Sequence, residues 1–422
     1  MAEEVWMLQT KKADFKQIGA RFRIDPVTAR IIRNRGIEGE AAIDRYLNGT
    51  LDDLYDPMLL KDMERAVSIL CEAVDTGKKI RIVGDYDIDG VCSTYILLQA
   101  FERLGSDVDF EIPDRIKDGY GINESIIEQA HADGVEVILT CDNGISAFHQ
   151  VELAKKYGMT VVITDHHEVP LDGEKEKIPP ADAVIDPKQA DCPYPFPEIC
   201  GAVVAYKLVQ VLYARRGVPQ MEWLDLLEFA AIATVGDVMK LQDENRILVK
   251  YGLKKMAQTK NLGLRRLAEK NNLDLGAITA YHIGFVIGPC LNAGGRLKTA
   301  KEALALLRAQ SEEEAERLAE ELKELNDTRK DMTEQGTEAA KLQVESWYQK
   351  DKVLVVFLPE CHESLAGIIA GRLREYYQKP AIVLTRGEEA VKGSGRSIDE
   401  YHMFKKLTEV SDLLLKFGGD PL

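Results

Sequence analysis

The stretch KIRIVGDYDIDGVCST (residues 79–94) runs an apolar strand pattern into three aspartates, Asp85, Asp87 and Asp89, and then into Gly90. A strand pattern followed at once by an apolar helical pattern predicts a tight turn at the end of a strand. Three carboxylates so close together raise one another's pKa, because like charges repel. We therefore expect a positively charged partner to neutralise these three carboxylates.

From Lys79 to about residue 187, short β-rich runs alternate with helical patterns. The strand candidates are KIRIVGD (79–85), VDFEIP (108–113), VEVILTCD (135–142), TVVITDHH (160–167) and DAVIDP (182–187). Strands separated by helices at this spacing indicate βαβ units and a parallel, doubly wound sheet. Ligands of such sheets bind at the carboxyl ends of the strands. The fold class that we predict is therefore α/β.

The composition is that of a globular protein, with 422 residues of which 45% are hydrophobic, enough for two or three domains. No run approaches the ~20 apolar residues of a membrane span, and the first residues lack the pattern of a secretory signal. We therefore expect a cytoplasmic protein without membrane contact. The seven cysteines are scattered without a CxxC pair, so neither a disulfide framework nor a zinc site is indicated.

The net charge of -16 argues against a protein that coats nucleic acid by bulk electrostatics, although a local basic groove remains compatible with it. Four regions are expected along the chain. They are a mostly helical lead-in (1–78), the first α/β domain (79–240), a helical region (241–349) and a second, smaller α/β lobe (350–422). The charged stretch from about Ser311 to Gln349 is expected to be a long connector helix, with a broken helix as the alternative.

Acidic and imidazole side chains follow three of the predicted strands. Asp85 and Asp87 end the first, Asp142 ends VEVILTCD, and three residues end TVVITDHH: Asp165, His166 and His167. Any one aspartate at a strand end is more often a turn former or a helix N-cap. A further carboxylate, Asp237, interrupts the apolar run AAIATVGDVM, where a buried charge is costly unless it is paired or metal-bound. Together these residues predict one site.

Carboxylate oxygens suit both manganese and magnesium, and an imidazole ligand shifts the preference toward manganese. Two divalent cations would neutralise four carboxylates and could activate water for attack at phosphorus. The pattern therefore predicts two divalent cations, Mn²⁺ with Mg²⁺ as the alternative, and hydrolysis of a phosphoester.

The motifs GDYDIDG, CDNG, TDHHE and VGDVM resemble, in order and spacing, those of the DHH phosphoesterase superfamily. Five further motifs resemble the RecJ family of single-strand-specific 5′ to 3′ DNA exonucleases: PDRIKDGYGIN, GPCLNAGGRL, CHESLAGIIAGRL, KGSGRS and the terminal FGG. This resemblance implies a DHH-type catalytic lobe that a long helix joins to a second lobe. It also implies single-stranded DNA as the substrate in recombination and repair, with a helicase and a single-strand-binding protein as partners of a monomer.

The resemblance also implies roles for individual residues. It makes five residues metal ligands, with Asp142 as the bridge: Asp85, Asp87, Asp142, His166 and Asp237. His167 would face the scissile phosphate, so that His167, Asp142 and Asp237 form the catalytic set. Asp89 and Asp165 would hold the ligands and the glycine turn in place, as the surroundings of metal sites generally do.

Substrate contacts are expected from Asn292 and Arg296 in LNAGGRL, and from Arg396 and Ser397 in KGSGRS, which would bind the 5′ phosphate. The alternative for each arginine is a surface ion pair. Tyr120 in DGYGIN would stack on a base, or would form a packed turn.

Beyond FGG, the family continues into the last strands of the second lobe and an OB-fold, whereas this sequence gives Asp420, Pro421 and Leu422. We therefore expect an incomplete second lobe, no OB-fold, and weaker and less processive DNA binding. Two alternative functions stay open, a phosphodiesterase for short oligonucleotides or cyclic dinucleotides and a non-catalytic DNA-binding remnant.

Overall fold

Five parallel strands form the sheet that carries the predicted site. Their order across the sheet is β2 (Val108–Glu111), β1 (Ile80–Val83), β3 (Val137–Cys141), β4 (Thr160–Thr164) and β7 (Ala183–Ile185). The chain passes from β1 to β2 on one side of β1, and then from β2 to β3 on the other side of β1. The switch point at which ligands of such sheets bind therefore lies between β1 and β3. The parallel sheet predicted from the sequence is confirmed.

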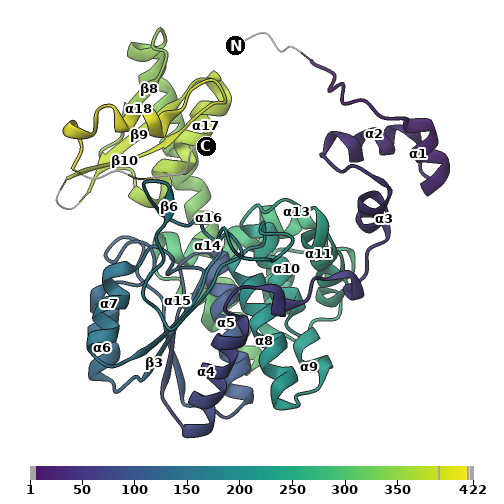
Figure 1. The fold of residues 1–422 in the computed structure, drawn as a ribbon. Helices are drawn as coiled ribbons and strands as arrows, with labels where there is room; N and C mark the ends of the chain where they lie inside the picture. Colours follow the sequence, from purple (N-terminus) through teal and green to yellow (C-terminus); the bar gives the residue numbers. More distant parts are fainter. Residues whose placement is uncertain (1–5, 388–389, 416–417, 419–422) are drawn as a thin grey trace. The chain divides into compact units, whose positions relative to one another are not determined.

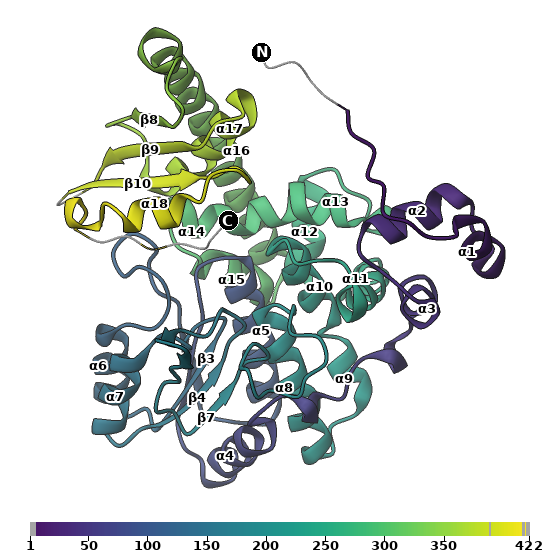
Figure 2. The ribbon, with the colours of Figure 1, turned by 45° about the horizontal axis from the view of Figure 1, so that its top comes forward.

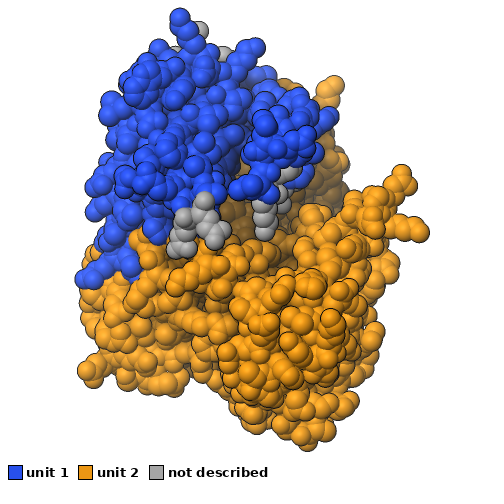
Figure 3. Space-filling model, turned by 90° about the vertical axis from the view of Figure 1, so that its left-hand side faces the viewer, with its two compact units in different colours: residues 1–7, 324–422 blue, residues 8–323 orange. Residues whose placement is uncertain are grey.

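The structure is a computed structural model that describes residues 6–387, 390–415 and 418. It divides into two compact units, one of residues 8–323 and the other mainly of residues 324–422 (Figure 3). Each unit is described by itself below. No helix in the described part of the chain is long and apolar enough to cross a bilayer.

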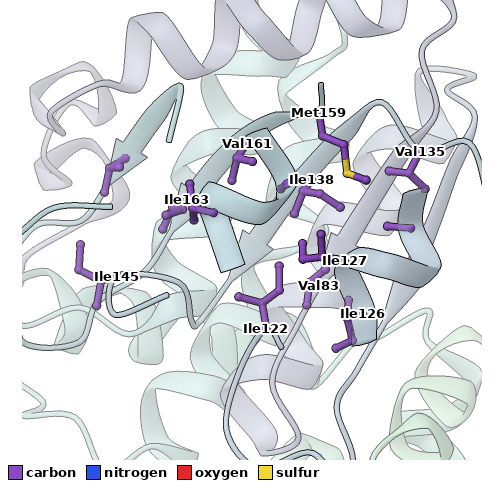
Figure 4. Close-up of a cluster of buried hydrophobic side chains, with 14 residues drawn as sticks. Val83, Ile122, Ile126, Ile127, Val135, Ile138, Ile145, Met159, Val161 and Ile163 are labelled. Carbon is purple, nitrogen blue, oxygen red and sulfur yellow. The ribbon is translucent and has the colours of Figure 1, made fainter. Parts of the chain in front are cut away.

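Helices cover both faces of the five-stranded sheet (Figure 1). One face packs against α6 (Glu124–Ala132) and α7 (Phe148–Lys156) through a cluster of buried aliphatic side chains that includes Ile127, Ile138 and Ile163 (Figure 4). The other face packs against α5 (Ile88–Arg103) and α8 (Gly201–Arg216), which also contact each other. Burying both faces explains why these strands read as continuous apolar runs.

The same unit contains further α-helices. They are α1 (Phe15–Phe22), α2 (Pro26–Asn34), α3 (Glu40–Asn48), α4 (Met63–Thr76), α9 (Gln220–Leu224), α10 (Leu227–Gly236), α11 (Asp243–Met256), α12 (Leu262–Lys270), α13 (Ala280–His282), α14 (Gly288–Leu297) and α15 (Lys301–Arg308). Within this group α10 contacts α5, α8 and α11. A small hairpin of β5 (Leu171–Asp172) and β6 (Lys175–Glu176) follows β4.

A buried ion pair fastens the segment before α4 to α8 and α11. Lys207 Nζ lies 3.0 Å from Glu244 Oε2 and donates to the carbonyl oxygen of Tyr55 over 3.1 Å. The Tyr194 hydroxyl donates to the other oxygen of Glu244. Lys207 and Glu244 are almost completely buried, so each charge depends on the other for compensation.

The predicted connector is one unbroken helix, α16 (Glu312–Gln343), which continues as a π-helical turn over Val344–Tyr348 (Figure 2). The boundary between the two compact units lies inside α16, between residues 323 and 324. The alternative of a broken helix is therefore wrong.

The second unit contains a three-stranded sheet in the order β10 (Val391–Arg396), β9 (Ala381–Arg386), β8 (Leu354–Phe357). β8 and β9 are parallel and β10 is antiparallel to β9. Helix α17 (Ala366–Tyr377) packs on this sheet, and the short α18 (Met403–Thr408) follows it. The predicted second α/β lobe is confirmed. The FGG motif lies outside the described residues except for Gly418, as do residues 419–422.

Candidate metal centre

The turn after β1 holds its first two carboxylates at the start of α5. Asp87 caps the helix, because its Oδ1 accepts the backbone N–H groups of Asp89 (2.9 Å) and Gly90 (3.1 Å). A Cβ atom on Gly90 would lie 2.4–2.6 Å from backbone atoms of Asp85, closer than any side chain tolerates. Glycine at position 90 is therefore what lets the helix begin directly beside Asp85.

The DGYGIN loop closes over this turn. Gly121 donates its N–H to Asp85 Oδ1 over 3.2 Å, and the Tyr120 hydroxyl donates to the carbonyl oxygen of Asp142 over 2.8 Å. The Tyr120 hydroxyl also lies 3.0 Å from His167 Nδ1. The side chain is anchored at its hydroxyl end although the residue is half exposed. The structure therefore shows the packed turn, while base stacking by Tyr120 stays a prediction.

Asp142 follows β3 in a left-handed backbone conformation, with φ of +60°. Such a φ is uncommon for a residue other than glycine and is often found at functional sites. Its side chain is buried against the start of α8, where a Cβ on Gly201 would lie 2.7 Å from Asp142 Cβ. Among the described residues, Asp142 Oδ1 has no hydrogen-bond partner, although His166 Nε2 lies 3.1 Å away.

The DHH triplet follows β4, and its aspartate holds the segment in place. Asp165 accepts the backbone N–H of His166 (2.7 Å) and of Ile145 (2.8 Å), and its Oδ1 lies 2.7 Å from His167 Nδ1. His166 Nδ1 is buried and has no hydrogen-bond partner in the described part of the chain. Asp165 thus supports both histidines, and the nitrogen of His166 that faces the carboxylates of Asp89 and Asp142 is Nε2.

Asp89 is completely buried between α5 and α8. Its two oxygens accept the first N–H groups of α8, those of Gly201 and Ala202, each over 2.7 Å. Asp89 Oδ2 also lies 3.4 Å from His166 Nε2. The carboxylate therefore neutralises the partial positive charge of a helix N-terminus while it faces the imidazole.

Asp237 differs from the expectation of a fully buried charge inside an apolar helix. It follows Gly236, the last residue of α10, and its side chain is 29% exposed. Its neighbour Val238 has φ of +58°, a conformation that ends the helix. Because the helix ends there, the Asp237 carboxylate reaches to 3.9 Å from His166 Nε2 without being sealed in the core.

The pKa values of the carboxylates in this centre are raised, as expected where negative charges are crowded without a positive charge to balance them. Burial, followed by the neighbouring carboxylates, raises the pKa of Asp85 and Asp142 well above the ordinary value. The same causes raise the pKa of Asp237 to about 8. Burial lowers the pKa of His166. For His167, burial is the largest single influence and lowers the pKa, but the hydrogen bond to Asp165 and the negative charges of Asp165, Asp89 and Asp237 together raise the pKa to about 9.

The possible ligand residues form three groups that share members, and within each group the ligand atoms lie within 4.8 Å of one another. The groups are Asp85, Asp87 and Asp142; Asp142, His166 and His167; and Asp89, His166 and Asp237. Carboxylate oxygens with one or two imidazoles suit Mn²⁺ and, less selectively, Mg²⁺. The partnerless Asp142 Oδ1, with His166 Nε2 3.1 Å away, fits such an occupant, because buried polar atoms are otherwise almost always paired. The residues present therefore fit a centre for divalent cations.

Two protein families match this architecture segment by segment. Residues 79–234 match the DHH family, N-terminal domain, and residues 350–421 match the DHHA1 domain. Over 417 residues the chain is 36% identical to the single-stranded-DNA-specific exonuclease RecJ of Escherichia coli (strain K12), covering 94% of this chain and 70% of that protein. The chain belongs to the RecJ family.

Two further RecJ proteins resemble the chain over almost all of its length. It is 37% identical to RecJ of Bacillus subtilis (strain 168) over an alignment of 420 residues, and this alignment covers 99% of this chain and 52% of that protein. A crystal structure of RecJ from Thermus thermophilus in complex with Mn²⁺ superposes with a TM-score of 0.81 at 30% identity, covering 96% of this chain and 57% of that one. The chain thus spans about half the length of these two RecJ relatives.

In this member of the RecJ family, the LNAGGRL motif forms α14 (Gly288–Leu297), which lies within the region expected to be helical (241–349). The helix packs against the turn after β1, since a Cβ on Gly295 would lie 2.3 Å from the carbonyl oxygen of Tyr86. Asn292 Oδ1 is buried without a hydrogen-bond partner among the described residues. Burial raises the pKa of Tyr86 to about 12, and the positive charge of Arg296 acts in the opposite direction, which places Arg296 near the Tyr86 ring. Both substrate candidates of this motif therefore lie in the same unit as the carboxylates.

The other two candidates lie in the second unit. The guanidinium of Arg396, at the end of β10, approaches α17, where a Cβ on Gly367 would lie 2.9 Å from Arg396 Nη2. Its Nη1 donates to the carbonyl oxygen of Gly395 over 2.7 Å, and the Ser397 hydroxyl donates to that of Tyr401. Their roles in phosphate binding stay predictions.

Three further polar residues at or near the strand ends were not singled out from the sequence. Asp186 follows β7, is completely buried, and has an Oδ2 without a hydrogen-bond partner among the described residues; burial raises its pKa to about 7. Asn143 joins the turns by donating to the carbonyl oxygens of Val83 and Cys141. The guanidinium carbon of Arg115 lies 4.6 Å from the centre of the Tyr86 ring. Asp186 could have been found, because DAVIDP ends in an aspartate as the other strands do.

Proposed function

We propose that the chain is a metal-dependent exonuclease that hydrolyses phosphodiester bonds of single-stranded DNA from the 5′ end. One observation carries the proposal: acidic and imidazole side chains from four segments converge around Asp142 Oδ1, a buried ligand atom that has no hydrogen-bond partner among the described residues. The family supports the choice of substrate. The similar proteins from Escherichia coli and Bacillus subtilis are single-stranded-DNA-specific exonucleases.

The cofactors that we propose are two divalent cations, Mn²⁺ with Mg²⁺ as the alternative. Asp85, Asp87 and Asp142 would hold one, and Asp142, His166 and Asp237 the other, which makes Asp142 the bridge. When bound, such ions offset the crowded negative charge and lower the pKa of a water molecule for attack at phosphorus. Asp89 and Asp165 act on their neighbours, since backbone N–H groups already occupy their oxygens.

His167 is the candidate for contact with the scissile phosphate. Its side chain is 43% exposed, and Asp165 accepts a hydrogen bond from Nδ1 and thereby orients the ring. A carboxylate behind an imidazole fixes the tautomer and favours a positive charge on the ring. His167 can therefore donate to a phosphate oxygen from a fixed direction.

Several side chains are available for the DNA strand itself. Arg296 and Asn292 on α14 are the candidates for phosphate contacts beside the carboxylates, and Arg396 and Ser397 are those for the 5′ phosphate. Tyr281 and Phe285 are 63% and 68% exposed and stack on each other with their ring centres 4.8 Å apart. Exposed aromatic pairs of this kind stack on bases of single strands without sequence preference.

The setting that we propose follows from this substrate. Free single strands arise when a helicase opens a duplex, and a single-strand-binding protein covers them, so both are proposed partners of a monomeric enzyme. The compartment would be the one that holds the DNA, the cytoplasm.

The test compares the wild-type chain with Asp142→Ala on 5′-phosphorylated single-stranded DNA, on the matching duplex and on dinucleotides. Each is assayed with Mn²⁺, with Mg²⁺ and with EDTA. Asp172→Ala, in the exposed β5–β6 hairpin, is the matched control. We expect stepwise release of mononucleotides from the single strand with Mn²⁺, a loss of roughly 1,000-fold or more in Asp142→Ala, and no loss in the control.

Equal activity in EDTA, or unchanged activity in Asp142→Ala, would contradict the metal-dependent mechanism. Faster hydrolysis of dinucleotides than of long single strands would replace the exonuclease with a phosphodiesterase for short oligonucleotides. Binding of single strands without hydrolysis under any metal would indicate a non-catalytic remnant.

A further inference from the structure

The N-terminal helices carry positive charge in a strongly acidic chain. Residues 11–35 hold eight lysines and arginines and two aspartates, a net charge of +6, whereas the whole chain has a net charge of -16. This segment lies outside both ranges that match the DHH and DHHA1 domains. Most of an acidic protein repels nucleic acid, so a locally basic segment is where a polyanion can approach.

Helices α1, α2 and α3 form a small module with a hydrophobic core of its own. α1 and α2 pack against each other (Figure 2) and are joined by only three residues, 23–25. At α3, Arg45 Nε lies 2.8 Å from Asp243 Oδ1 and thereby fastens the module to α11. The core contains Ile32, Ile37, Ile43 and Tyr46, against which Ile18, Phe22, Ile24 and Leu47 pack.

Six basic side chains gather where the start of α1 meets the end of α2. Lys11 Nζ donates to the carbonyl oxygen of Asn34 over 3.1 Å, and Arg33 Nε donates to that of Lys12 over 3.3 Å. The guanidinium carbon of Arg30 lies 4.3 Å from the ring centre of Phe15, the residue before Lys16. These contacts bring the six residues of the basic patch together: Lys11, Lys12, Lys16, Arg30, Arg33 and Arg35.

The acidic groups beside the basic patch leave much of its charge uncompensated. Asp14 caps α1, where its Oδ1 accepts the N–H of Gln17 over 2.9 Å. Glu38 Oε1 lies 2.8 Å from Arg33 Nη1, but the Glu38 side chain is 65% exposed, and exposed pairs contribute little. Three exposed members of the patch have no carboxylate partner among the described residues: Lys12, Lys16 and Arg35.

We propose that the basic patch binds the phosphate backbone of duplex DNA beside the single strand that is degraded. The choice of DNA as the polyanion rests on the proposed function. Sites for single strands combine cations with exposed aromatic rings. Within residues 11–48, by contrast, Phe15 and Phe22 are half-buried and Tyr46 is buried. Two short helices joined by a three-residue turn are, moreover, a common way to present side chains to a duplex.

This contact would position the enzyme without reading the base sequence. Cations that meet phosphate oxygens fix the register of a protein on DNA, whereas sequence is read at the base edges. A duplex that ends in a 5′ single-stranded tail therefore offers two grips, the tail and the backbone beside it. The second grip raises the affinity for such a substrate above that for the tail alone.

The test measures DNA binding by fluorescence anisotropy with the full chain in EDTA, so that the probes are not shortened. The probes are a blunt duplex and one of its strands, each of about 20 nucleotides, over a series of salt concentrations. The patch variant neutralises three exposed cations: Lys12→Gln, Lys16→Gln and Arg35→Gln. The matched control removes the same charge at three exposed lysines elsewhere: Lys156→Gln, Lys175→Gln and Lys350→Gln.

We expect the patch variant to bind the duplex roughly 10-fold or more weakly at about 0.1 M salt, because it loses three phosphate contacts. The slope of log affinity against log salt should fall by about 2–3, since each contact contributes about 0.9. The control should stay within about 2-fold of the wild type. Circular dichroism verifies folding, and Lys16→Gln alone, with a slope lowered by about 1, serves if the triple variant does not fold.

Hydrolysis with Mn²⁺ supplies a second measurement. The patch variant should raise KM for a duplex with a 5′ single-stranded tail roughly 10-fold more than KM for the plain single strand. Asp142→Ala should bind the blunt duplex in EDTA with the wild-type affinity and salt slope. Failure of the basic patch and failure of the proposed exonuclease are therefore distinguishable.

Four results would overturn the proposal. Equal loss of duplex affinity in the patch variant and the control would indicate bulk charge, and an unchanged salt slope would show that these cations meet no phosphates. Loss of single-strand binding without loss of duplex binding would assign the patch to the single strand. Absence of duplex binding by the wild type at micromolar concentration would leave the patch to another acidic partner.

Discussion

Replacing Asp89 by asparagine separates support of the metal centre from direct metal binding. Both oxygens of Asp89 accept N–H groups from the start of α8, at Gly201 and Ala202, and the side chain is completely buried. Asparagine keeps one acceptor and places an NH₂ group against the second N–H. The variant therefore loses one charge-assisted hydrogen bond and leaves one buried N–H without an acceptor.

The size of the effect follows from these contacts. A hydrogen bond to a charged group contributes about 1.5–3 kcal/mol, and a buried N–H without a partner costs about 1–3 kcal/mol. Burial raises the pKa of Asp89, so removal of its charge offsets part of this loss. We expect the free energy of unfolding of Asp89→Asn to fall by about 2–4 kcal/mol in the absence of metal.

The assay is urea unfolding in EDTA, followed by titration with Mn²⁺ and by the rate of DNA hydrolysis. Asp89→Asn should reduce Mn²⁺ affinity by about 10- to 100-fold, the usual effect of a residue that supports a ligand. Asp237→Asn is the control with the opposite pattern. It should not destabilise the metal-free chain, because the carboxylate there is partly exposed and repelled by its neighbours, but it should lose Mn²⁺ binding at one of the two sites.

The reasoning would be refuted if Asp89→Asn unfolded at the wild-type urea concentration in EDTA while losing one Mn²⁺ site completely. Asp89 would then be a direct ligand, as its position with His166 and Asp237 also allows.

Three further changes test buried groups elsewhere in the first unit and at the start of α8. Lys207→Met should lower the free energy of unfolding by about 3–5 kcal/mol, measured by urea titration, because it leaves the buried Glu244 without its cation. Glu228→Gln should raise stability above pH 7 by at most about 3 kcal/mol and have no effect below pH 4.5, since the raised folded-state pKa makes ionisation unfavourable as pH rises; a constant difference between about pH 4 and pH 8 would contradict this. Gly201→Ala should cost about 1–3 kcal/mol by overpacking and weaken Mn²⁺ binding, because its Cβ would displace Asp142; wild-type metal affinity would show that the helix start adapts.

The strands and their acidic ends could be predicted from the sequence because both signals are local. Apolar runs of four or five residues, each followed by a polar group, identified β1, β3 and β4 together with Asp85, Asp142 and Asp165. In a parallel sheet all carboxyl ends face the same edge, so residues far apart in the chain converge as soon as the strand direction is known. The connector helix α16 could also be predicted from the sequence, because its segment is long and highly charged.

Other features depend on contacts that the sequence does not display. The region 241–349 was expected to be helical, but the sequence does not display that Gly295 allows α14 to approach the carbonyl oxygen of Tyr86. Asp237 was expected inside a helix, although α10 ends one residue before it. Asp186 follows a strand as the other aspartates do, but only the tertiary structure shows that burial leaves one of its oxygens without a partner among the described residues.

By itself, the sequence determined the α/β fold, the order of the motifs and the kinds of ligand available, because strand patterns and residue types are properties of short segments. The tertiary structure alone showed which contacts distinguish the three aspartates of GDYDIDG. Asp85 meets the DGYGIN loop, Asp87 caps α5, and Asp89 binds the start of α8. The physical reason is that a carboxylate's role depends on which N–H groups reach it, and those groups come from distant parts of the chain.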